Sequence, residues 1–312
     1  MTALRLGTRA STLATTQSRW VADLLTSRIG RPVDLVTIST EGDRSTAPLA
    51  SMGGTGVFVS ALREALLDGQ VDFAVHSLKD IPTAAAEGIT LAAVPTREDP
   101  RDVLVARDGL TLGELPVGSR IGTGSPRRAS QLEALGLGLE VCELRGNVET
   151  RLGKVTSGDL DAIVLARAGL ARIDRLEVVT ETLDPLQMLP APGQGALAVE
   201  CRTADTDLVQ ALAVLDDAGS RACITAERAV LATLEAGCSA PLGALAEVVE
   251  GEHGDELWIR AVALSPDGAL SVRHSASGPL GDAAGVGTRL AELMLDEGAA
   301  DLMETTARKP HA

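Results

Sequence analysis

The sequence predicts an α/β fold made of two lobes, followed by a small C-terminal α+β domain. Over the first 95 residues, apolar strand-like runs alternate with helical patterns, which is typical of a mostly parallel sheet. Two short motifs of this first lobe recur, in the same order, in the next hundred residues. After residue 240, three strand-like runs follow one another between two helical patterns, which favours a separate α+β domain.

The first lobe is expected to alternate three strands with two helices. Strands are predicted at 4–7, 33–39 and 71–76, and helices at about 13–28 and 57–68. Residues 41–56 are too long and glycine-rich for a simple connection, so they form either a mobile lid or a surface loop without a role. They are not a phosphate-binding loop, because no Gly-Lys-Ser/Thr closes them.

A second lobe follows a predicted hinge at 95–103, which carries two prolines and many charges. Beyond the hinge, residues 120–131 repeat the pattern of 5–11, and residues 158–164 repeat that of 69–75. The repeats predict two related lobes with a ligand cleft at the hinge, unless short Gly-Thr turns recur by chance.

Residues 193–200 are expected to cross back to the first lobe as a strand. In the C-terminal region we expect a helix at about 220–235, strands at 244–250, 257–264 and 269–276, and a helix at about 283–303. The resulting domain boundaries are 1–98 plus 193–215 for the first lobe, 99–192 for the second lobe and 216–312 for the C-terminal α+β domain.

Composition excludes several classes of protein. The chain has 312 residues, no tyrosine and few aromatic rings, so its cores must be aliphatic and base stacking is an improbable mode of recognition. A formal charge of −15 repels nucleic acid and anionic membranes. Neither a signal peptide nor a membrane-spanning run is visible, so a cytoplasmic protein is expected. The four cysteines lack metal-ligand spacing, so neither a metal site nor a disulfide framework is expected.

The strongest candidate for chemistry is the stretch that follows the strand at 71–76. His76, Ser77, Lys79 and Asp80 crowd the carboxyl end of this strand, where open α/β sheets place their ligands. Lysine is rare in this chain, occurring only at positions 79, 154 and 309, so Lys79 is not a routine surface cation. Asp80 is therefore the candidate reactive group, and the alternative is a solvated loop.

Arginines gather at the starts of several predicted helices. Ser125 and Pro126 predict a helix start that places Arg127 and Arg128 in the first turn, where the helix dipole disfavours cations. Two such arginines call for an anion, a carboxylate or a phosphate, unless both side chains point into water. Similar turns contain the following residues: Arg9 and Ser11, Arg145 and Arg151, and Arg172.

If both lobes are doubly wound, these turns face one cleft with many arginines and one aspartate. Such a cleft suits a ligand with several carboxylates, and an ionised aspartate in it can hold a developing cation and shuttle protons. Cys238 differs from the other cysteines because it lies in a Gly/Pro loop. Its thiol is either an attachment point or that of a plain loop cysteine.

Six motifs together resemble the porphobilinogen deaminase family, also called hydroxymethylbilane synthases. The motifs are Gly7–Ser11, His76–Pro82, Gly122–Arg128, Leu144–Val148, Gly193–Ala196 and Gly237–Pro241. They appear in the order found in that family, and the resemblance covers residues 4 to about 303. It implies two lobes like those of periplasmic binding proteins, a third domain and a monomer.

The resemblance also implies an activity and roles for individual residues. Four molecules of porphobilinogen lose ammonia and are joined into the linear tetrapyrrole hydroxymethylbilane, on a dipyrromethane cofactor held by a thioether at Cys238. Asp80 would be the catalytic carboxylate. Substrate-binding positions would be Arg9, Ser11 and Gln17. Cofactor-binding positions would be Ser77, Lys79, Thr123, Ser125, Arg127, Arg128, Arg145, Arg151 and Arg172.

One departure from the family pattern lies in the lid, where Ser51 and Thr55 replace lysines of many relatives. This change predicts weaker electrostatic closure of the lid. Two other readings of the sequence stay open: a bilobed binding protein for a small polycarboxylate without turnover, and a transferase in which Cys238 is a transient nucleophile.

Overall fold

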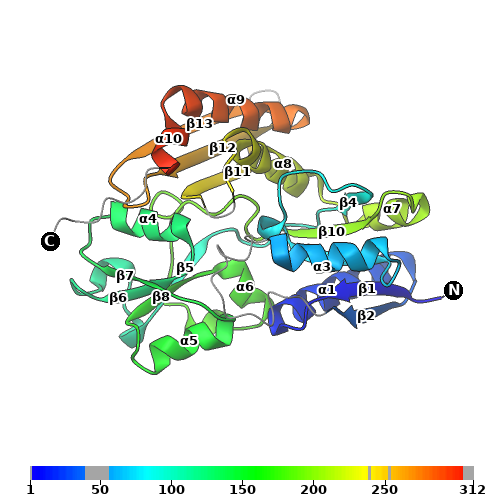
Figure 1. The fold of residues 1–312 in the computed structure, drawn as a ribbon, viewed down its shortest axis with the longest axis horizontal. Coiled ribbons are helices and arrows are strands. Elements are labelled where there is room, and N and C mark those ends of the chain that lie inside the picture. Colours follow the sequence, from blue (N-terminus) through cyan, green and yellow to red (C-terminus); the bar gives the residue numbers. More distant parts are fainter. Residues whose placement is uncertain (1, 39–55, 238–239, 252–253, 305–312) are drawn as a thin grey trace. The chain divides into compact units, whose positions relative to one another are not determined.

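The computed structural model describes residues 2–38, 56–237, 240–251 and 254–304. It divides into two compact units, one of residues 1–98 with 195–221, the other of residues 99–194 with 222–312. The first unit is the first lobe, and the second unit contains the second lobe and the C-terminal domain (Figure 1). Residues 41–55 of the predicted lid and Cys238, the predicted attachment point of the cofactor, lie outside the described residues.

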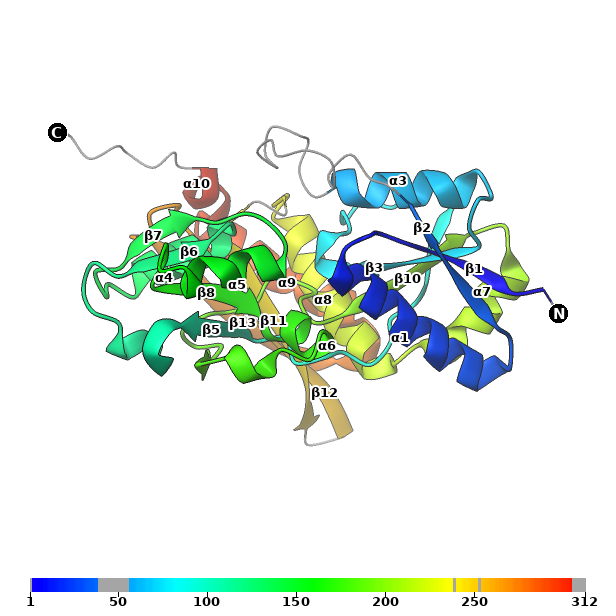
Figure 2. The ribbon, with the colours of Figure 1, turned by 90° about the horizontal axis from the view of Figure 1, so that it is seen from below.

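The first lobe is a five-stranded mixed sheet with helices on both faces. Its strands are β1 Leu4–Thr8, β2 Val33–Thr37, β3 Phe73–Ser77, β4 Ile89–Ala93 and β10 Leu197–Arg202, in the order β2-β1-β3-β10-β4. Helices α1 Thr12–Ile29 and α7 Thr206–Leu212 cover one face, and α3 Gly56–Leu67 covers the other (Figure 2). The predicted return of the chain is confirmed, because β10 pairs antiparallel with β3 and β4.

The second lobe repeats this arrangement. Its strands are β5 Asp102–Ala106, β6 Arg120–Thr123, β7 Glu140–Glu143, β8 Ala162–Ala166 and β9 Glu181–Thr182, in the order β7-β6-β8-β5-β9. Helix α4 Pro126–Ala134 covers one face, and α5 Val148–Thr156 with α6 Arg167–Arg172 covers the other (Figure 1). In both lobes the fourth strand in the sheet order, β10 in the first and β5 in the second, runs antiparallel to its neighbours. Each of these strands begins shortly after the residue at which the chain passes from one unit to the other.

The internal repeat predicted from the sequence is confirmed down to single hydrogen bonds. In the first lobe the Arg5 amide donates to the Asp72 carboxylate at 2.7 Å, and the Asp72 amide donates to the Arg5 carbonyl at 2.8 Å. Arg120 and Asp161 make the same two bonds in the second lobe, at 2.7 and 2.9 Å. This reciprocal pair fixes the register of the first and third strands, which explains why these residues recur at matching positions.

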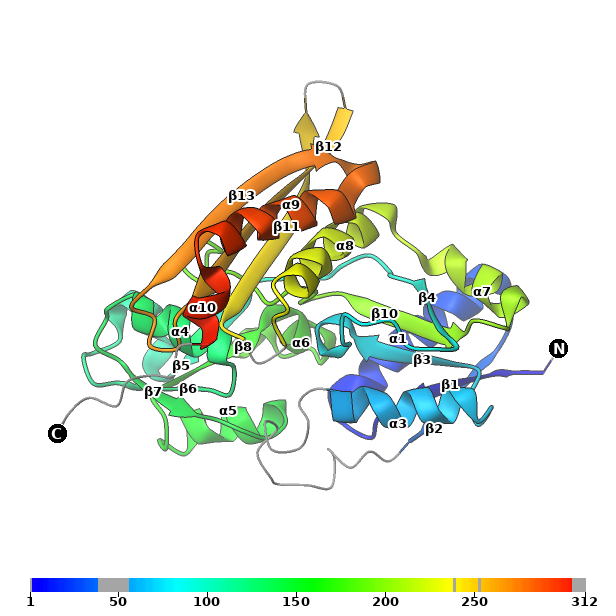
Figure 3. The ribbon, with the colours of Figure 1, turned by 45° about the horizontal axis from the view of Figure 1, so that its top comes forward.

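The C-terminal domain is a three-stranded antiparallel sheet covered by helices on one face. Its strands are β11 Leu242–Gly251, β12 Gly254–Leu264 and β13 Ser271–Pro279, and its helices are α8 Ala218–Thr233, α9 Ala283–Asp296 and α10 Ala299–Glu304. The helices pack on an aliphatic core that includes Ala226, Val230, Ile259 and Leu290 (Figure 3). The single closing helix predicted at 283–303 is wrong: Gly298 adopts φ +82°, which separates α9 from α10.

Candidate functional site

In the first lobe, Asp80 is held at the carboxyl end of β3 by a short turn. The strand ends at Ser77 and continues directly as a 3₁₀ turn, Leu78–Asp80. The Leu78 amide donates to the Ala196 carbonyl at 3.0 Å, and Leu78 and Ile81 are both buried. These two buried side chains, one on either side of Asp80 in sequence, therefore fix its position at the edge of the sheet.

Asp80 lines a small pocket with most of the residues predicted for this lobe. The pocket has a volume of about 90 Å³, and its polar lining consists of Arg9, Ser11, Gln17, His76, Ser77 and Asp80. The Gln17 side chain donates from Nε2 to Ser77 Oγ at 3.3 Å, which joins α1 to β3 across the pocket. Leu13, Val59 and Leu62 supply apolar walls. Lys79 does not line this pocket.

Arg9 and Ser11 reach the pocket because they lie in the turn between β1 and α1. Ser11 is the N-cap of α1, and its hydroxyl accepts a hydrogen bond from the Ala14 amide at 3.3 Å. The buried Ser18 hydroxyl donates to Thr8 Oγ1 at 2.8 Å and holds the helix against the end of the strand. This turn presents a guanidinium, a hydroxyl and helical N–H groups on the same side as Asp80.

A buried cluster of charges lies behind the pocket. Glu200 on β10 accepts two hydrogen bonds from Arg63, at 2.9 and 2.6 Å, and His76 Nε2 lies 3.4 Å from its Oε2. Burial raises the pKa of the Glu200 carboxyl, but the hydrogen bonds from Arg63 and the interaction with His76 outweigh burial and lower this pKa to about 2. Because His76 lines the pocket, this cluster connects the pocket to Arg63 on α3.

In the second lobe, Arg127 and Arg128 lie in the first turn of α4, as predicted, but they do not point into water. Both side chains are buried and bind Asp102, a fully buried residue on β5, at 2.7 and 2.8 Å. Burial raises the pKa of Asp102, but the two guanidinium groups outweigh it and lower the pKa to about 2. The anion that the sequence predicted for these arginines is thus present as a carboxylate of the chain itself, Asp102.

The same network extends to the segment that leads back to the first lobe. Arg127 Nη1 and Gln131 Nε2 both donate to the Leu189 carbonyl, at 2.6 and 3.0 Å. The Gln194 side chain donates to the Pro100 carbonyl at 2.7 Å and to Asp102 at 2.8 Å. Gly193 and Gly195 flank Gln194 with φ of +78° and +86°, a region that favours glycine, which explains the Gly-Gln-Gly motif.

Arg151 is a half-buried cation of this lobe that binds no carboxylate in the described part of the chain. Its Nε donates to the Gly146 carbonyl at 2.8 Å, and among the described residues no acidic side chain binds it. Burial, together with the nearby positive charges of Arg128 and Arg145, lowers the pKa of Arg151. A half-buried guanidinium beside two others is an unsatisfied positive site, and the chemical group that fits it is a carboxylate or a phosphate.

The remaining predicted residues of this lobe are more scattered. Thr123 ends β6 and its Oγ1 accepts a hydrogen bond from the Ser125 amide at 3.1 Å, so both lie at the start of α4. Arg145 follows β7 and binds Glu143 at 2.9 Å. Arg172, which the sequence places after a short Gly-containing segment that follows the strand at 162–165, is the last residue of α6.

Sequence reasoning missed the buried carboxylates Asp102 and Glu200 and their hydrogen-bonding partners Arg63 and Gln194. A signal existed for the acids, since Asp102 begins and Glu200 interrupts an otherwise apolar run, Asp-Val-Leu-Val-Ala and Leu-Ala-Val-Glu-Cys. A charge within a buried strand predicts a charged partner. Nothing in the sequence identifies that partner, which comes from a helix more than twenty residues away.

Fold and site define a class: a two-lobed α/β protein with a carboxylate pocket in one lobe, an arginine cluster in the other, and a third α+β domain. Two protein-family models match the chain. Residues 4–210 match the dipyrromethane cofactor binding domain of porphobilinogen deaminase, and residues 221–296 match the C-terminal domain of that enzyme. The chain therefore belongs to the porphobilinogen deaminase family.

Curated relatives are similar over nearly the whole length. Porphobilinogen deaminase of Mycobacterium tuberculosis H37Rv is 62% identical over 96% of this chain and 98% of its own, and that of Mycobacterium marinum is 58% identical over 98% and 99%. Among solved structures, the methionine binding protein MetQ matches at a TM-score of 0.43 and 13% identity, covering 68% of this chain and 89% of its own, a likeness too low to bear on function.

Proposed function

We propose that this chain catalyses the reaction named for its family, the joining of four porphobilinogen molecules into hydroxymethylbilane with release of ammonia. The observation that carries the proposal is the first-lobe pocket, which brings Asp80 together with Arg9, Ser11 and Gln17. Membership of the family favours an enzyme over the bilobed binding protein and the cysteine-dependent transferase that the sequence also allowed.

Each residue of the pocket has a task that follows from its chemistry. Arg9 and the N–H groups at the start of α1 bind a carboxylate of the substrate. Ser77 and Gln17, which are hydrogen-bonded to each other, orient the ring. As the bond between the aminomethyl carbon and nitrogen breaks and ammonia leaves, positive charge develops on the substrate, and the carboxylate of Asp80 stabilises that charge. Asp80 also accepts the proton lost when the new carbon–carbon bond forms.

The second lobe fits a cofactor that carries several carboxylates. Arg151 offers a guanidinium without a carboxylate partner in the described part of the chain, and Thr123, Ser125, Arg128 and Arg145 lie in the turns beside it or interact with it. When bound, dipyrromethane supplies the free pyrrole carbon at which the first substrate is added. In this proposal, Arg151 and Arg145 bind carboxylates, whereas Arg127 and Arg128 hold the turn in place through Asp102.

Five further expectations stay predictions. Attachment of the cofactor to Cys238 and the consequences of Ser51 and Thr55 fall on residues outside the described ranges. Among the described residues no helix is long and apolar enough to cross a bilayer. A cytoplasmic location and a monomeric state, as well as domain boundaries near residues 98, 192 and 216, are retained as proposals.

The intact mass of the purified protein tests the cofactor assignment. We expect a stable excess equal to two linked pyrrole units in wild type and in Cys142→Ser, a control at a half-buried cysteine of β7. The excess should be absent from Cys238→Ser. An active protein of unmodified mass would overturn the proposal, as would a Cys238→Ser variant that keeps the added mass.

A further inference from the structure

One face of the C-terminal sheet is left partly open. The opposite face packs against α8, α9 and α10. Among the described residues, the open face is covered at one end, where Leu189 contacts Leu245, Val262 and Leu264 in a small apolar cluster. The same side of the sheet also carries Trp258 and Arg260 on β12 and Arg273 on β13, which pairs with Val262 of the cluster.

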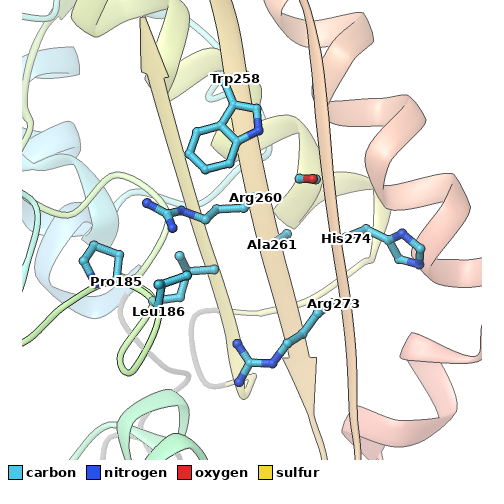
Figure 4. A pocket seen from close by; sticks show the side chains of 9 residues that line it. Pro185, Leu186, Trp258, Arg260, Ala261, Arg273 and His274 are labelled. Atoms are coloured by element: carbon cyan, nitrogen blue, oxygen red, sulfur yellow. The ribbon is translucent and has the colours of Figure 1, made fainter. Parts of the chain in front are cut away.

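These side chains line a shallow pocket against the loop that follows β9. The pocket has a volume of about 420 Å³, within the range of small-molecule sites. Pro185, Leu186 and Leu189 of the loop form one wall, and Trp258, Arg260 and Arg273 form the other (Figure 4). His274 lies beside them in sequence, but its ring points away from the pocket, toward the helices (Figure 4). It binds Glu297 at 2.9 Å.

Two arginines of the pocket have guanidinium N–H groups without a hydrogen-bond partner among the described residues. The Arg260 guanidinium lies 4.7 Å from the centre of the Trp258 ring, and its Nη2 binds Glu247 at 3.2 Å. Its Nε is buried and has no hydrogen-bond partner. Arg273 is exposed, and no side chain among the described residues binds it. Two guanidinium groups line this pocket and no acidic side chain of the described residues does, in a protein whose net charge is −15.

The apolar part of the pocket is equally unusual for a surface. Leu186 is 75% exposed and faces the pocket beside Pro185. Trp258 is one of only two tryptophans in the chain, and its ring is already held by the cation above it. An aromatic face, an aliphatic wall and an unpaired guanidinium are the groups that recognise a flat ring carrying a negative charge.

We propose that this pocket binds a small planar aromatic carboxylate, with its ring beside Trp258 and Leu186 and its carboxylate on the exposed guanidinium of Arg273. All lining residues belong to the unit that contains the second lobe and the C-terminal domain. None of them belongs to the site proposed for catalysis, so this inference stands independently of the proposed function.

Tryptophan fluorescence tests the proposal directly. In a Trp20→Phe background Trp258 is the only indole, and the chain has no tyrosine to interfere. The probe is 4-nitrobenzoate, whose nitroaromatic ring quenches an indole on contact, and 4-nitrobenzamide is its uncharged counterpart. We expect saturable quenching by the acid, with at least about fivefold weaker binding of the amide because it lacks the charge that binds Arg273.

A matched pair of variants separates this site from general attraction to positive charge. Arg273→Gln should weaken the acid at least about fivefold, whereas Arg289→Gln, at an exposed arginine of α9 that binds Asp282, should leave its affinity unchanged. Circular dichroism confirms that both variants are folded. Quenching that does not saturate, equal binding of acid and amide, or equal effects of the two variants would each overturn the proposal.

Discussion

The two lobes share one topology but differ at the carboxyl end of the third strand. When the two lobes are aligned on the pairs Arg5–Asp72 and Arg120–Asp161, Asp80 of the first lobe corresponds in sequence to Gly169 of the second. The first lobe thus has a carboxylate where the second has no side chain at all. The scaffold is duplicated, whereas the group capable of stabilising a cation is present once.

The turn after the first strand differs in the same way. Arg9 of the first lobe corresponds to Gly124 of the second. A Cβ atom at Gly124 would lie 2.5 Å from the Leu144 carbonyl oxygen, so only glycine fits there without a shift of the backbone. The second lobe therefore carries its cations further along, in α4 and α5. We infer that the first lobe holds the reacting substrate and the second lobe holds carboxylates.

Both lobes have a buried carboxylate on the antiparallel fourth strand, Glu200 in the first and Asp102 in the second. We expect the largest effect on the free energy of unfolding when Asp102 is replaced. Asp102→Asn leaves two buried guanidinium groups without a carboxylate and should lower the free energy of unfolding by about 3–5 kcal/mol. Glu200→Gln should lower it by only about 1–3 kcal/mol, because the Arg63 side chain is 16% exposed and can reach water. Urea unfolding at pH 7 measures both, and a larger loss for Glu200→Gln would contradict the comparison.

Acidification should remove the stabilisation from both carboxylates. Their folded-state pKa values of about 2 lie below the ordinary values of 3.8 for Asp102 and 4.5 for Glu200, so the stabilisation is full above about pH 5 and is lost as the pH falls toward 2. Each group contributes on the order of 2–3 kcal/mol. Urea midpoints between pH 6 and 3 should fall steeply for wild type and less steeply for Glu200→Gln, and parallel slopes would refute this assignment.

The smallest expected effect on stability is at Arg151, which has like charges beside it and no carboxylate. Arg151→Gln should change the free energy of unfolding by less than about 1 kcal/mol, since removing a repelled charge offsets the lost hydrogen bond to Gly146. The same change should weaken citrate binding about tenfold in calorimetric titration. Arg289→Gln is the matched control on an exposed helix. Unchanged citrate affinity in Arg151→Gln would remove the anion site from the second lobe.

The alternation of strands and helices, the repeat and the return strand could be predicted from the sequence, because each depends on local periodicity or on a short motif. The helix start at Ser125-Pro126 was likewise confirmed, since it depends on neighbouring residues, although the Ser125 side chain makes no capping hydrogen bond. Strands β4 and β5 were not predicted, and the closing helix was predicted as one rather than two.

The candidate site was predictable only in part. The pocket residues Arg9, Ser11, Ser77 and Asp80 all adjoin strand ends, so the α/β pattern places them together. The pairing of Arg127 and Arg128 with Asp102 was not predictable, because the helix dipole shows that a cation needs an anion without showing which one. A contact between residues 25 positions apart depends on the tertiary fold rather than on local sequence.

Ammonia release by Asp80→Asn is the measurement that tests the central claim most directly. The rate is compared with that of wild type and of Asp68→Asn, a control at an exposed aspartate after α3, in protein whose intact mass shows the two-pyrrole excess. We predict that Asp80→Asn folds normally and releases ammonia at least about 100-fold more slowly, while Asp68→Asn matches wild type. Release at a near-normal rate by Asp80→Asn would contradict the assignment of the chemistry to the first lobe.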